Sequence, residues 1–372
     1  MTPPRPPPTP RATPATHDPR ASAPALVLGI ESSCDETAVA LVADGRHVLA
    51  ERVASQIDLH ARFGGVIPEL ASRSHLEVLF PLVEETLAAA GIPLHGMGAP
   101  DALAVTHTPG LVGCLLVGLS AAKGLSLSTG LPLVGVNHVH AHVYGALMPH
   151  LAEGTGDPSV EIEWPLASLV VSGGHTSLYE SRSPTEHRRV GRTLDDAAGE
   201  AYDKVAAVLG LGYPGGPVVD KLAATGDPAA HAFPRSKGQG LDFSFSGLKT
   251  AVLYACKGGA DGNFSQSLLP GVAPADVAAS FQAAVVDVLV DRLERCADEL
   301  GARGLVICGG VAANSALRVR AAELAERLGL PLYRPPMRLA TDNAVMIAGL
   351  GHHLLAAGVR HDLSLDAVPR AD

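Results

Sequence analysis

The feature that most constrains the fold of this chain is a unit of strand, polar turn and strand that occurs twice. In the first copy, LVLGIE (26–31) predicts a buried strand, SSCDET a tight polar turn and AVALVADG a returning strand. LASLVVS (166–172), GGHTS and LYES repeat this order roughly 140 residues later. An internal repeat of one supersecondary unit indicates a duplicated architecture, so we expect two related lobes that face each other.

The segments between the two units alternate between helix and strand periodicity. Helical spacing covers 68–90 and 111–123, and short apolar strands are expected at 102–106 and 133–136. This alternation is typical of an α/β protein, which is the fold class that we predict.

The last third of the sequence predicts a long helix, a strand, a glycine turn and a second helix. Apolar residues within 277–296 recur every three to five positions along one helix face. GLVIC (304–308) has the pattern of a strand, and 315–328 that of a helix. Ligands bind at strand-to-helix crossovers of this kind in α/β folds. The turn at this crossover carries Gly309, Gly310 and Asn314.

Composition excludes several classes of protein. The 372 residues suggest about two domains, and a hydrophobic content of 47% argues against a disordered chain. A formal charge of −10 excludes a uniformly basic nucleic-acid surface, and 4% aromatic residues argue against recognition by base stacking. The five cysteines form no C-x-x-C pair, which excludes a disulfide scaffold and a cysteine-rich zinc site.

The ends of the sequence differ from its middle. Residues 1–24 hold nine of the 29 prolines and no apolar stretch, so we predict a disordered tail and no secretory signal.

The longest apolar stretch, 111–136, is interrupted by Lys123 and several glycines, which favours a buried helix followed by a strand over a membrane span. We expect a first lobe at 25–135, a second lobe at 136–360 with a cleft between them, and a tail at 361–372.

The run NHVHAH (137–142) is the first candidate for chemistry. His138 and His142 are four residues apart, so on a helix they share one face and can bind a single metal ion. His140 would point elsewhere. Imidazoles that cap the helix or lie in solvent are the alternative. A metal needs a further ligand, for which Asp342 is a candidate, although that residue could equally be a helix N-cap.

Two polar turns occupy matching positions in the two repeated units. In VSGGH (171–175), Gly173 and Gly174 would let backbone N–H groups approach a phosphate, with an ordinary hairpin turn as the alternative. SSCDE (32–36) is the equivalent turn of the first unit. Facing each other across a cleft, the two turns would hold a nucleotide between them.

A cluster of acidic residues follows the second unit. On a helix, Asp196, Glu200, Asp203 and Lys204 fall on or near one face, and a solvated charged face is the alternative interpretation. The tight turn at 213–217 and Asp220 suggest a backbone wall for a sugar or substrate. The sequence contains no P-loop, no G-x-S-x-G elbow and no H-E-x-x-H motif.

Nine motifs in one order resemble a known family. They are GIESSCDETAVA, GGVIPELASRSHLE, NHVHAH, LVVSGGHTSL, LDDAAGEAYDKVA, YPGGPVVD, FSFSGLKTA, CGGVAANSALR and TDNAVMIA. Together they resemble the TsaD family of tRNA N6-adenosine threonylcarbamoyltransferases, long called O-sialoglycoprotein endopeptidases, from about Leu26 to beyond Gly349. The VSGGH variant is similar to bacterial members. The resemblance implies the two-lobed fold of the actin, Hsp70 and sugar-kinase (ASKHA) superfamily, with RNase H-like lobes.

The resemblance also implies a site. One divalent metal ion, usually iron with zinc as the alternative, would be held by His138, His142 and Asp342. Asp35 and Glu36 match acidic residues linked to activity. The substrate threonylcarbamoyl-adenylate, or a nucleotide such as ATP, would contact Val171, Ser172, Gly173, Gly174, His175, Asp203, Gly216, Asp220 and Asn314.

The implied reaction transfers threonylcarbamoyl to N6 of adenosine 37 in tRNAs that read codons beginning with A, in the cytoplasm. TsaB and TsaE would be partners, TsaC would supply the adenylate, and no membrane would be involved. An acidic chain is a poor binder of a polyanion by itself. Either these partners hold the tRNA, or a local patch of Arg235, Lys237 and Lys249 does.

Small departures from the family pattern leave every implied ligand in place. Thr108 stands before Pro-Gly where Gly is usual, Ser32 replaces a common Thr, and Ala340 replaces a common Cys. The alternative functions are a small-molecule kinase or carbamoyltransferase of the same superfamily, a nucleotide-dependent scaffold or chaperone-like ATPase, and the older endopeptidase.

Overall fold

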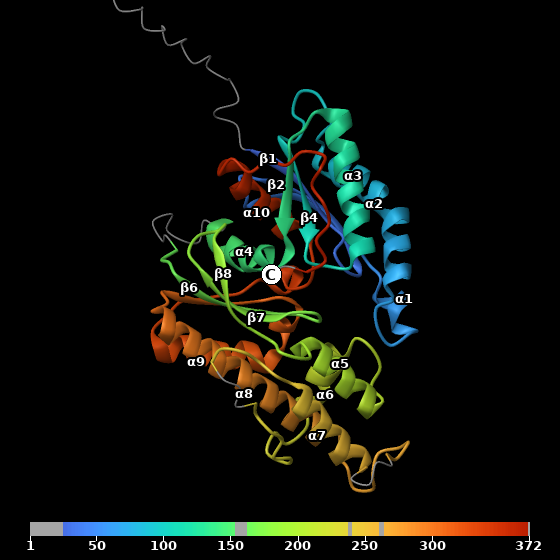
Figure 1. The fold of residues 1–372 in the computed structure, drawn as a ribbon, viewed down its shortest axis with the longest axis vertical. Helices are drawn as coiled ribbons and strands as arrows, with labels where there is room; N and C mark the ends of the chain where they lie inside the picture. The colour runs from blue at the N-terminus through green and yellow to red at the C-terminus, as the bar shows by residue number, and fades with distance from the viewer. Residues whose placement is uncertain (1–24, 153–161, 237–239, 260–263, 371–372) are drawn as a thin grey trace, which may run out of the picture.

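The computed structural model describes residues 25–152, 162–236, 240–259 and 264–370. The predicted disordered tail at 1–24 lies outside the described residues, as does Lys237. Two five-stranded sheets form the centres of two lobes (Figure 1).

The first sheet has the order β3-β2-β1-β4-β5. Strand β1 pairs antiparallel with β2 and parallel with β4, so the strand, turn and strand unit lies at the centre of the sheet. Pairing is antiparallel between β2 and β3 and parallel between β4 and β5. The strands are β1 (Leu26–Glu31), β2 (Glu36–Ala43), β3 (His47–Ser55), β4 (Ala102–Thr108) and β5 (Leu133–Asn137).

The second sheet repeats this arrangement in the order β10-β9-β6-β7-β8. Strand β6 pairs antiparallel with β7 and parallel with β9, as β1 does with β2 and β4. Its strands are β6 (Leu166–Val171), β7 (Thr176–Ser181), β8 (His187–Arg192), β9 (Gly304–Cys308) and β10 (Leu332–Tyr333). The predicted duplication and α/β class are therefore confirmed.

The helices cover both faces of the two sheets. They are α1 (Ile57–Ala61), α2 (Pro68–Ala90), α3 (Val112–Thr129), α4 (His138–Ala152), α5 (Ala198–Leu209), α6 (Gly215–Ala223), α7 (Ser246–Lys257), α8 (Pro274–Leu300), α9 (Ser315–Leu328) and α10 (Ala344–Ala356). Two short 3-10 turns lie at Gly310–Ala313 and Met337–Leu339. The helices predicted at 68–90 and 315–328 have these bounds in the structure.

Alternating strand residues separate the two faces of the first sheet. Leu28 and Ile30 of β1 pack with α2 and α3, whereas Val27 packs with α4 and α10. By length and composition α3 could span a membrane, but 39% of that stretch is buried in the protein. It packs on α2 and β4 and is followed by β5, as predicted for a buried helix and a strand.

Helix α4 lies between the two lobes. Ala141 and Tyr144 belong to the core under the first sheet, together with α10. Val139 and Val143 belong to a separate core with Leu166 and other residues of the second sheet. The helix that carries the NHVHAH motif thus contacts both lobes, and its N-terminus lies at the junction.

The division into lobes at residues 135 and 136 remains a prediction, and the packing of α10 bears on it. This helix falls in the range assigned to the second lobe, yet it packs on β1, β2 and β4. The contact is close because Gly29 faces α10: a Cβ at Gly29 would lie 2.5 Å from the carbonyl oxygen of Ala344. In space, α10 therefore belongs to the first lobe, where it packs on one face of the first sheet.

Candidate functional site

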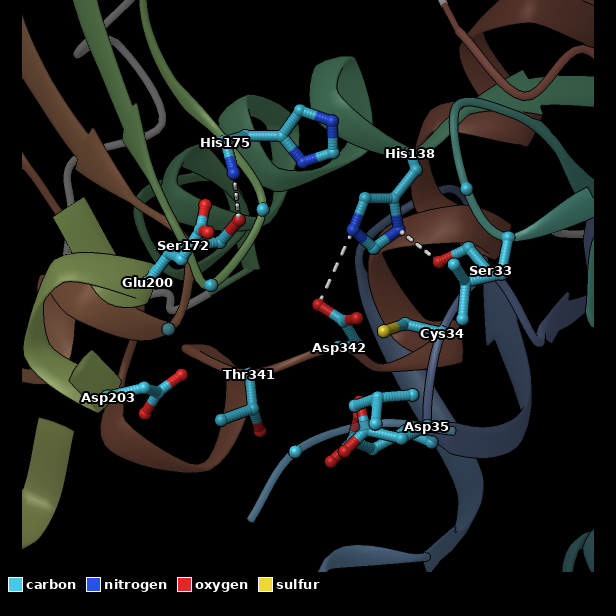
Figure 2. A pocket seen from close by; sticks show the side chains of 18 of the residues that line it. Ser33, Cys34, Asp35, His138, Ser172, His175, Glu200, Asp203, Thr341 and Asp342 are labelled. Carbon is cyan, nitrogen blue, oxygen red and sulfur yellow. Dashed lines mark hydrogen bonds and ion pairs between the residues drawn. The ribbon is translucent and has the colours of Figure 1, made fainter. Parts of the chain in front are cut away.

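A cavity of about 650 Å³ lies at the junction of the lobes and is lined from both sides. Figure 2 shows side chains of the first-lobe loop, of α4 and of the second-lobe turn around it. The lining residues include 33–36, 64–66, 109–111, 172–175, His138, Glu200, Asp203, Lys204, Tyr213, Gly310, Thr341, Asp342 and Pro369.

Two histidines and one aspartate meet in the wall of this cavity. His138 is the first residue of α4, directly after β5, and His142 lies one turn later; both are buried. Asp342 Oδ1 lies 3.0 Å from His142 Nε2 and 3.4 Å from His138 Nε2. One ligand atom from each of the three residues lies within 4.8 Å of the other two. The predicted triad is therefore assembled in space.

The alternative role of these residues, capping the start of a helix, is taken by neighbouring asparagines. Asn137 Oδ1 accepts hydrogen bonds from Val139 N at 2.9 Å and His140 N at 3.2 Å, so Asn137 caps α4. Asn343 Oδ1 accepts from Met346 N at 3.0 Å and caps α10. The imidazoles and Asp342 are thus not needed as caps and can act as ligands.

The chemistry of the triad fits a divalent cation. Two imidazole nitrogens and one carboxylate form a donor set that suits iron(II) and zinc. Burial lowers the pKa of His142, which favours the neutral ligand form. Burial opposes ionisation of Asp342, but His138 and His142 outweigh it and hold the pKa of this carboxyl well below its usual range. His142 and Asp342 thus have the protonation states that metal binding requires. Burial opposes the charge on His138, but Asp342 and Glu31 outweigh it and hold the pKa of this imidazole well above its usual value, so His138 would release a proton when a cation binds.

Glu31 holds His138 from the side opposite to Asp342. This carboxylate is fully buried at the end of β1, and its Oε2 accepts from His138 Nδ1 at 2.9 Å and from Thr106 Oγ1 at 2.6 Å. Oε1 accepts from Ser33 N at 2.5 Å. With Nδ1–H donated to Glu31, the other ring nitrogen of His138 is left to face Asp342. Sequence reasoning did not single out Glu31, since a lone carboxylate in an apolar strand gives no sign of its partner.

His140 points away from the triad, as predicted. Its ring packs against Tyr179 at a centroid distance of 5.6 Å and against His187 at 4.7 Å. Burial lowers the pKa of His140 to about 3, so this imidazole is neutral at physiological pH.

The VSGGH turn closes the hairpin of β6 and β7, and its residues 172–175 also line the cavity. Its approach to a phosphate stays a prediction. Ser172 N donates to His175 O at 2.7 Å, and Ser172 Oγ accepts from His175 N at 3.1 Å. A Cβ at Gly173 or Gly174 would meet nothing within 4 Å, so the main chain borders open space there. The turn rests on α5, where Gly199 N donates to Ser172 O at 3.2 Å.

The equivalent first-lobe turn carries the two candidate catalytic carboxyls. Ser33, Cys34, Asp35 and Glu36 all line the cavity. Burial, Asp342 and Asp35 together raise the pKa of Glu36 to about 9. Burial also raises the pKa of the Cys34 thiol well above its usual value, which makes a thiolate nucleophile unfavourable there.

The acidic cluster continues the cavity wall along α5. Asp203 accepts from Gly215 N at 2.7 Å, and burial raises the pKa of its carboxyl. Lys204 forms ion pairs with Asp196 and Glu200, each at 2.7 Å. Lys204 is the one Lys or Arg among the described residues that line the cavity, and its charge is matched by these carboxylates.

Four predicted substrate residues, Val171, Gly216, Asp220 and Asn314, lie elsewhere in the second lobe. Val171 is fully buried in β6, and Gly216 is in the first turn of α6. Asp220 accepts from Asn314 Nδ2 at 3.1 Å and from Ser315 N at 3.1 Å, which ties α6 to the start of α9. These four residues are not among those that line the cavity, whereas 172–175 and Asp203 are.

Several lining residues come from segments that sequence reasoning left without a site role. Gly64–Val66 belong to a motif that carried the family resemblance, so the motif was the available signal. Pro369 had none, because it reaches the cavity through a tertiary contact only. Tyr213, by contrast, begins the turn at 213–217 that was predicted to form a wall of the site.

The structure gives little support to Arg235 and Lys249 as parts of a basic patch for tRNA. Arg235 is paired with Asp287 at 3.1 Å, and Lys249 with Asp196 at 2.7 Å. Each of these cations is therefore already matched by a carboxylate.

Comparisons with known proteins give one consistent result. The family model described as TsaD: tRNA N6-adenosine threonylcarbamoyltransferase matches residues 47–349. A protein of that name from Symbiobacterium thermophilum is 53% identical over 345 residues, which cover 92% of this chain and 96% of the relative. Another from Anaeromyxobacter dehalogenans is 51% identical over 346 residues, covering 92% and 98%.

Solved structures agree with the predicted fold. HypF from T. kodakarensis superposes with a TM-score of 0.58 at 14% identity, over 90% of this chain and 48% of HypF. Full-length HypF in a phosphate- and nucleotide-bound form gives 0.57 at 14% identity, over 90% and 48%. The two-lobed ASKHA-like architecture is thereby confirmed.

Proposed function

The chain belongs to the TsaD family of tRNA N6-adenosine threonylcarbamoyltransferases, and we propose that its cleft transfers threonylcarbamoyl from threonylcarbamoyl-adenylate to N6 of adenosine 37. Its substrates would be tRNAs that read codons beginning with A. The observation that carries this proposal is the meeting of the His138, His142 and Asp342 triad with the turns 33–36 and 172–175 around one cavity.

The chemistry explains why such a cavity is needed. The lone pair of adenosine N6 is conjugated with the purine ring, so N6 is a weak nucleophile. Holding N6 against the carbamoyl carbon removes much of the entropic cost of the encounter. Polar groups that stabilise the developing oxyanion and the departing AMP lower the barrier further. A cavity lined from both lobes can hold the two substrates at once.

Asp35 and Glu36 would take up the proton that N6 loses. Their carboxyls lie side by side on the first-lobe turn, and the raised pKa of Glu36 favours its protonated form near neutral pH. A protonated Glu36 can donate a hydrogen bond but is a poor acceptor of the N6 proton, so Asp35 is the member of the pair to which we assign proton acceptance.

His138, His142 and Asp342 would hold one divalent ion, iron(II) with zinc as the alternative. When bound, this ion supplies a Lewis acid for substrate oxygens. Glu31 keeps His138 in the orientation that ligation requires.

The glycine turn would bind the phosphate of the adenylate, or of ATP. Gly173 and Gly174 border open space, so the backbone N–H groups of the turn are accessible to an anion. Asp203 at the cavity, with Val171, Gly216, Asp220 and Asn314 elsewhere in the second lobe, would shape the nucleotide side of the site.

Partner proteins would supply the positive charge for tRNA binding that the cavity of this chain lacks. The family acts on tRNA, yet the cavity carries more carboxylates than cations, and phosphate contacts need Lys or Arg. We therefore assign tRNA holding in part to TsaB and TsaE, with TsaC as the source of the adenylate, in the cytoplasm.

The test replaces His138 and His142 by Ala in a reconstituted tRNA modification assay with threonylcarbamoyl-adenylate. We expect loss of the bound metal and at least a hundredfold loss of rate. His140→Ala removes a histidine from the same helix outside the triad and is the matched control. Full activity of the double variant would refute the metal-dependent mechanism. Unchanged threonylcarbamoyladenosine in tRNA from cells depleted of the protein would refute the function itself.

A further inference from the structure

Residues 361–370, which the sequence placed in a tail, run along the first lobe to the rim of the cleft. His361 N donates to Leu133 O at 2.8 Å, and His361 Nδ1 accepts from Gly135 N at 3.0 Å. Strand β5 is an edge strand, and edge strands leave backbone groups unpaired. This pairing covers part of that edge. Leu365 and Ala367 then pack against the core beneath α2 and α3, which anchors the segment.

Beyond this anchor, the segment forms hydrogen bonds with His107, near the end of β4, and with Gly110 in the turn that follows β4. Val368 N donates to His107 O at 2.9 Å, and His107 Nδ1 donates to Asp366 O at 3.3 Å. Gly110 N donates to Pro369 O at 3.2 Å. Three hydrogen bonds thus hold residues 366–369 against residues 107–110.

The turn after β4, residues 109–111, also contacts the 33–36 loop of the first lobe. Leu111 N donates to Ser33 O at 2.8 Å. A Cβ at Gly110 would lie 2.6 Å from the same carbonyl oxygen, so the two backbones are already as close as they can be. Ser33 Oγ lies 3.2 Å from His138 Nδ1, and Pro369 itself lines the cavity. A continuous set of contacts therefore joins the 366–369 stretch to the triad.

We propose that residues 366–370 form a wall of the transfer site and position the 33–36 loop through the 109–111 turn. This inference rests on the proposed function, since it concerns the same reaction. An element that acts by positioning controls how well the bound groups are aligned, and a displacement of 1 Å can cost roughly a hundredfold in rate. Its loss should therefore lower kcat much more than it raises KM for tRNA.

The experiment uses Val368, whose side chain is 44% exposed and whose N–H bonds to His107. Val368→Pro removes that N–H. Leu363→Pro is the matched control: it places a proline in the same segment but outside the proposed wall, at a side chain that is 45% exposed and at the second position of the 362–365 turn, which accepts proline. We expect Val368→Pro to lower kcat at least tenfold, with KM for tRNA within about threefold and the melting temperature nearly unchanged. Leu363→Pro should behave as the wild type.

A pair of shortened chains tests the same point without proline. A chain that ends after Leu365 lacks the wall, and one that ends after Arg370 keeps all its described contacts. Loss of kcat in the first chain alone supports the proposal. Equal kcat in all variants of an active wild type overturns it, as does a loss of activity that only follows a loss of folded protein. Failure of the proposed function is distinct, because the wild-type chain itself would then be inactive.

Discussion

Glu31 shows how one residue can control the chemistry of another. Burial opposes its ionisation, yet His138 lowers the pKa of this carboxyl overall, so the fully buried side chain is charged. A buried charge is costly unless it is paired and hydrogen-bonded. His138, Thr106 and the backbone of Ser33 provide those bonds.

We therefore expect Glu31→Gln to weaken metal binding by roughly 10- to 100-fold, because an outer carboxylate orients a ligating histidine and raises its basicity. The measurement is a titration of the metal-free protein with iron(II) or zinc, with the metal content counted independently. Glu77→Gln alters an exposed glutamate of α2 and serves as the control. Equal affinity for metal in both variants would contradict the assigned role.

Among the elements, α4 and α10 decide where the triad forms. Helix α4 packs on both sheets, and α10 packs on the first sheet although it follows the second in sequence. The loop before α10 carries Asp342, so the depth at which α10 rests on β1 sets the distance from Asp342 to the histidines.

Gly29→Ala tests this dependence on depth. Its Cβ would lie 2.5 Å from Ala344 O and 2.7 Å from Ala348 N, both backbone atoms that cannot rotate away. We expect a loss of roughly 1–3 kcal/mol in the free energy of unfolding, together with weaker metal binding, since overpacking displaces α10. Denaturant unfolding and metal titration measure the two effects.

Gly124→Ala is the control for this substitution, because its Cβ in α3 would meet nothing within 4 Å. An alanine inside a helix should leave stability equal or slightly higher. If Gly29→Ala behaved like this control, α10 would not rest on β1 as closely as described.

The whole molecule forms its cavity by bringing two homologous turns together. SSCDE of the first lobe and VSGGH of the second occupy equivalent places after β1 and β6. A nucleotide held between them contacts both lobes, so its binding should stabilise the folded protein as a unit.

Gly174→Val should abolish that effect without harming the fold. The added side chain would enter open space at the cavity, where Gly174 now has no neighbour within 4 Å. A stable analogue of threonylcarbamoyl-adenylate at a hundred times its Kd should stabilise the wild type by about 2.7 kcal/mol. The variant should unfold at the wild-type temperature and show no such shift. A full ligand-induced shift in a folded variant would place the nucleotide elsewhere.

Most of the local structure and part of the site follow from residue spacing within short segments of the sequence. Apolar periodicity predicted strands at 26–31 and 166–172, the second one residue longer than β6, and helices at 68–90 and 315–328, because burial of one face imposes a spacing on neighbouring residues. The four-residue spacing of His138 and His142 likewise places both on one helix face wherever that helix lies.

Contacts between residues far apart in the sequence depend instead on how the folded chain packs. Asp342 lies 200 positions from His142, and local patterns left it as either a ligand or an N-cap until the family resemblance grouped it with the histidines. Glu31 lies 107 positions from His138, and nothing in its own neighbourhood indicates that partner. The same holds for α10 on the first sheet and for Pro369 at the cavity. Such contacts follow from the order of strands and the packing of whole layers, which depend on the entire chain at once.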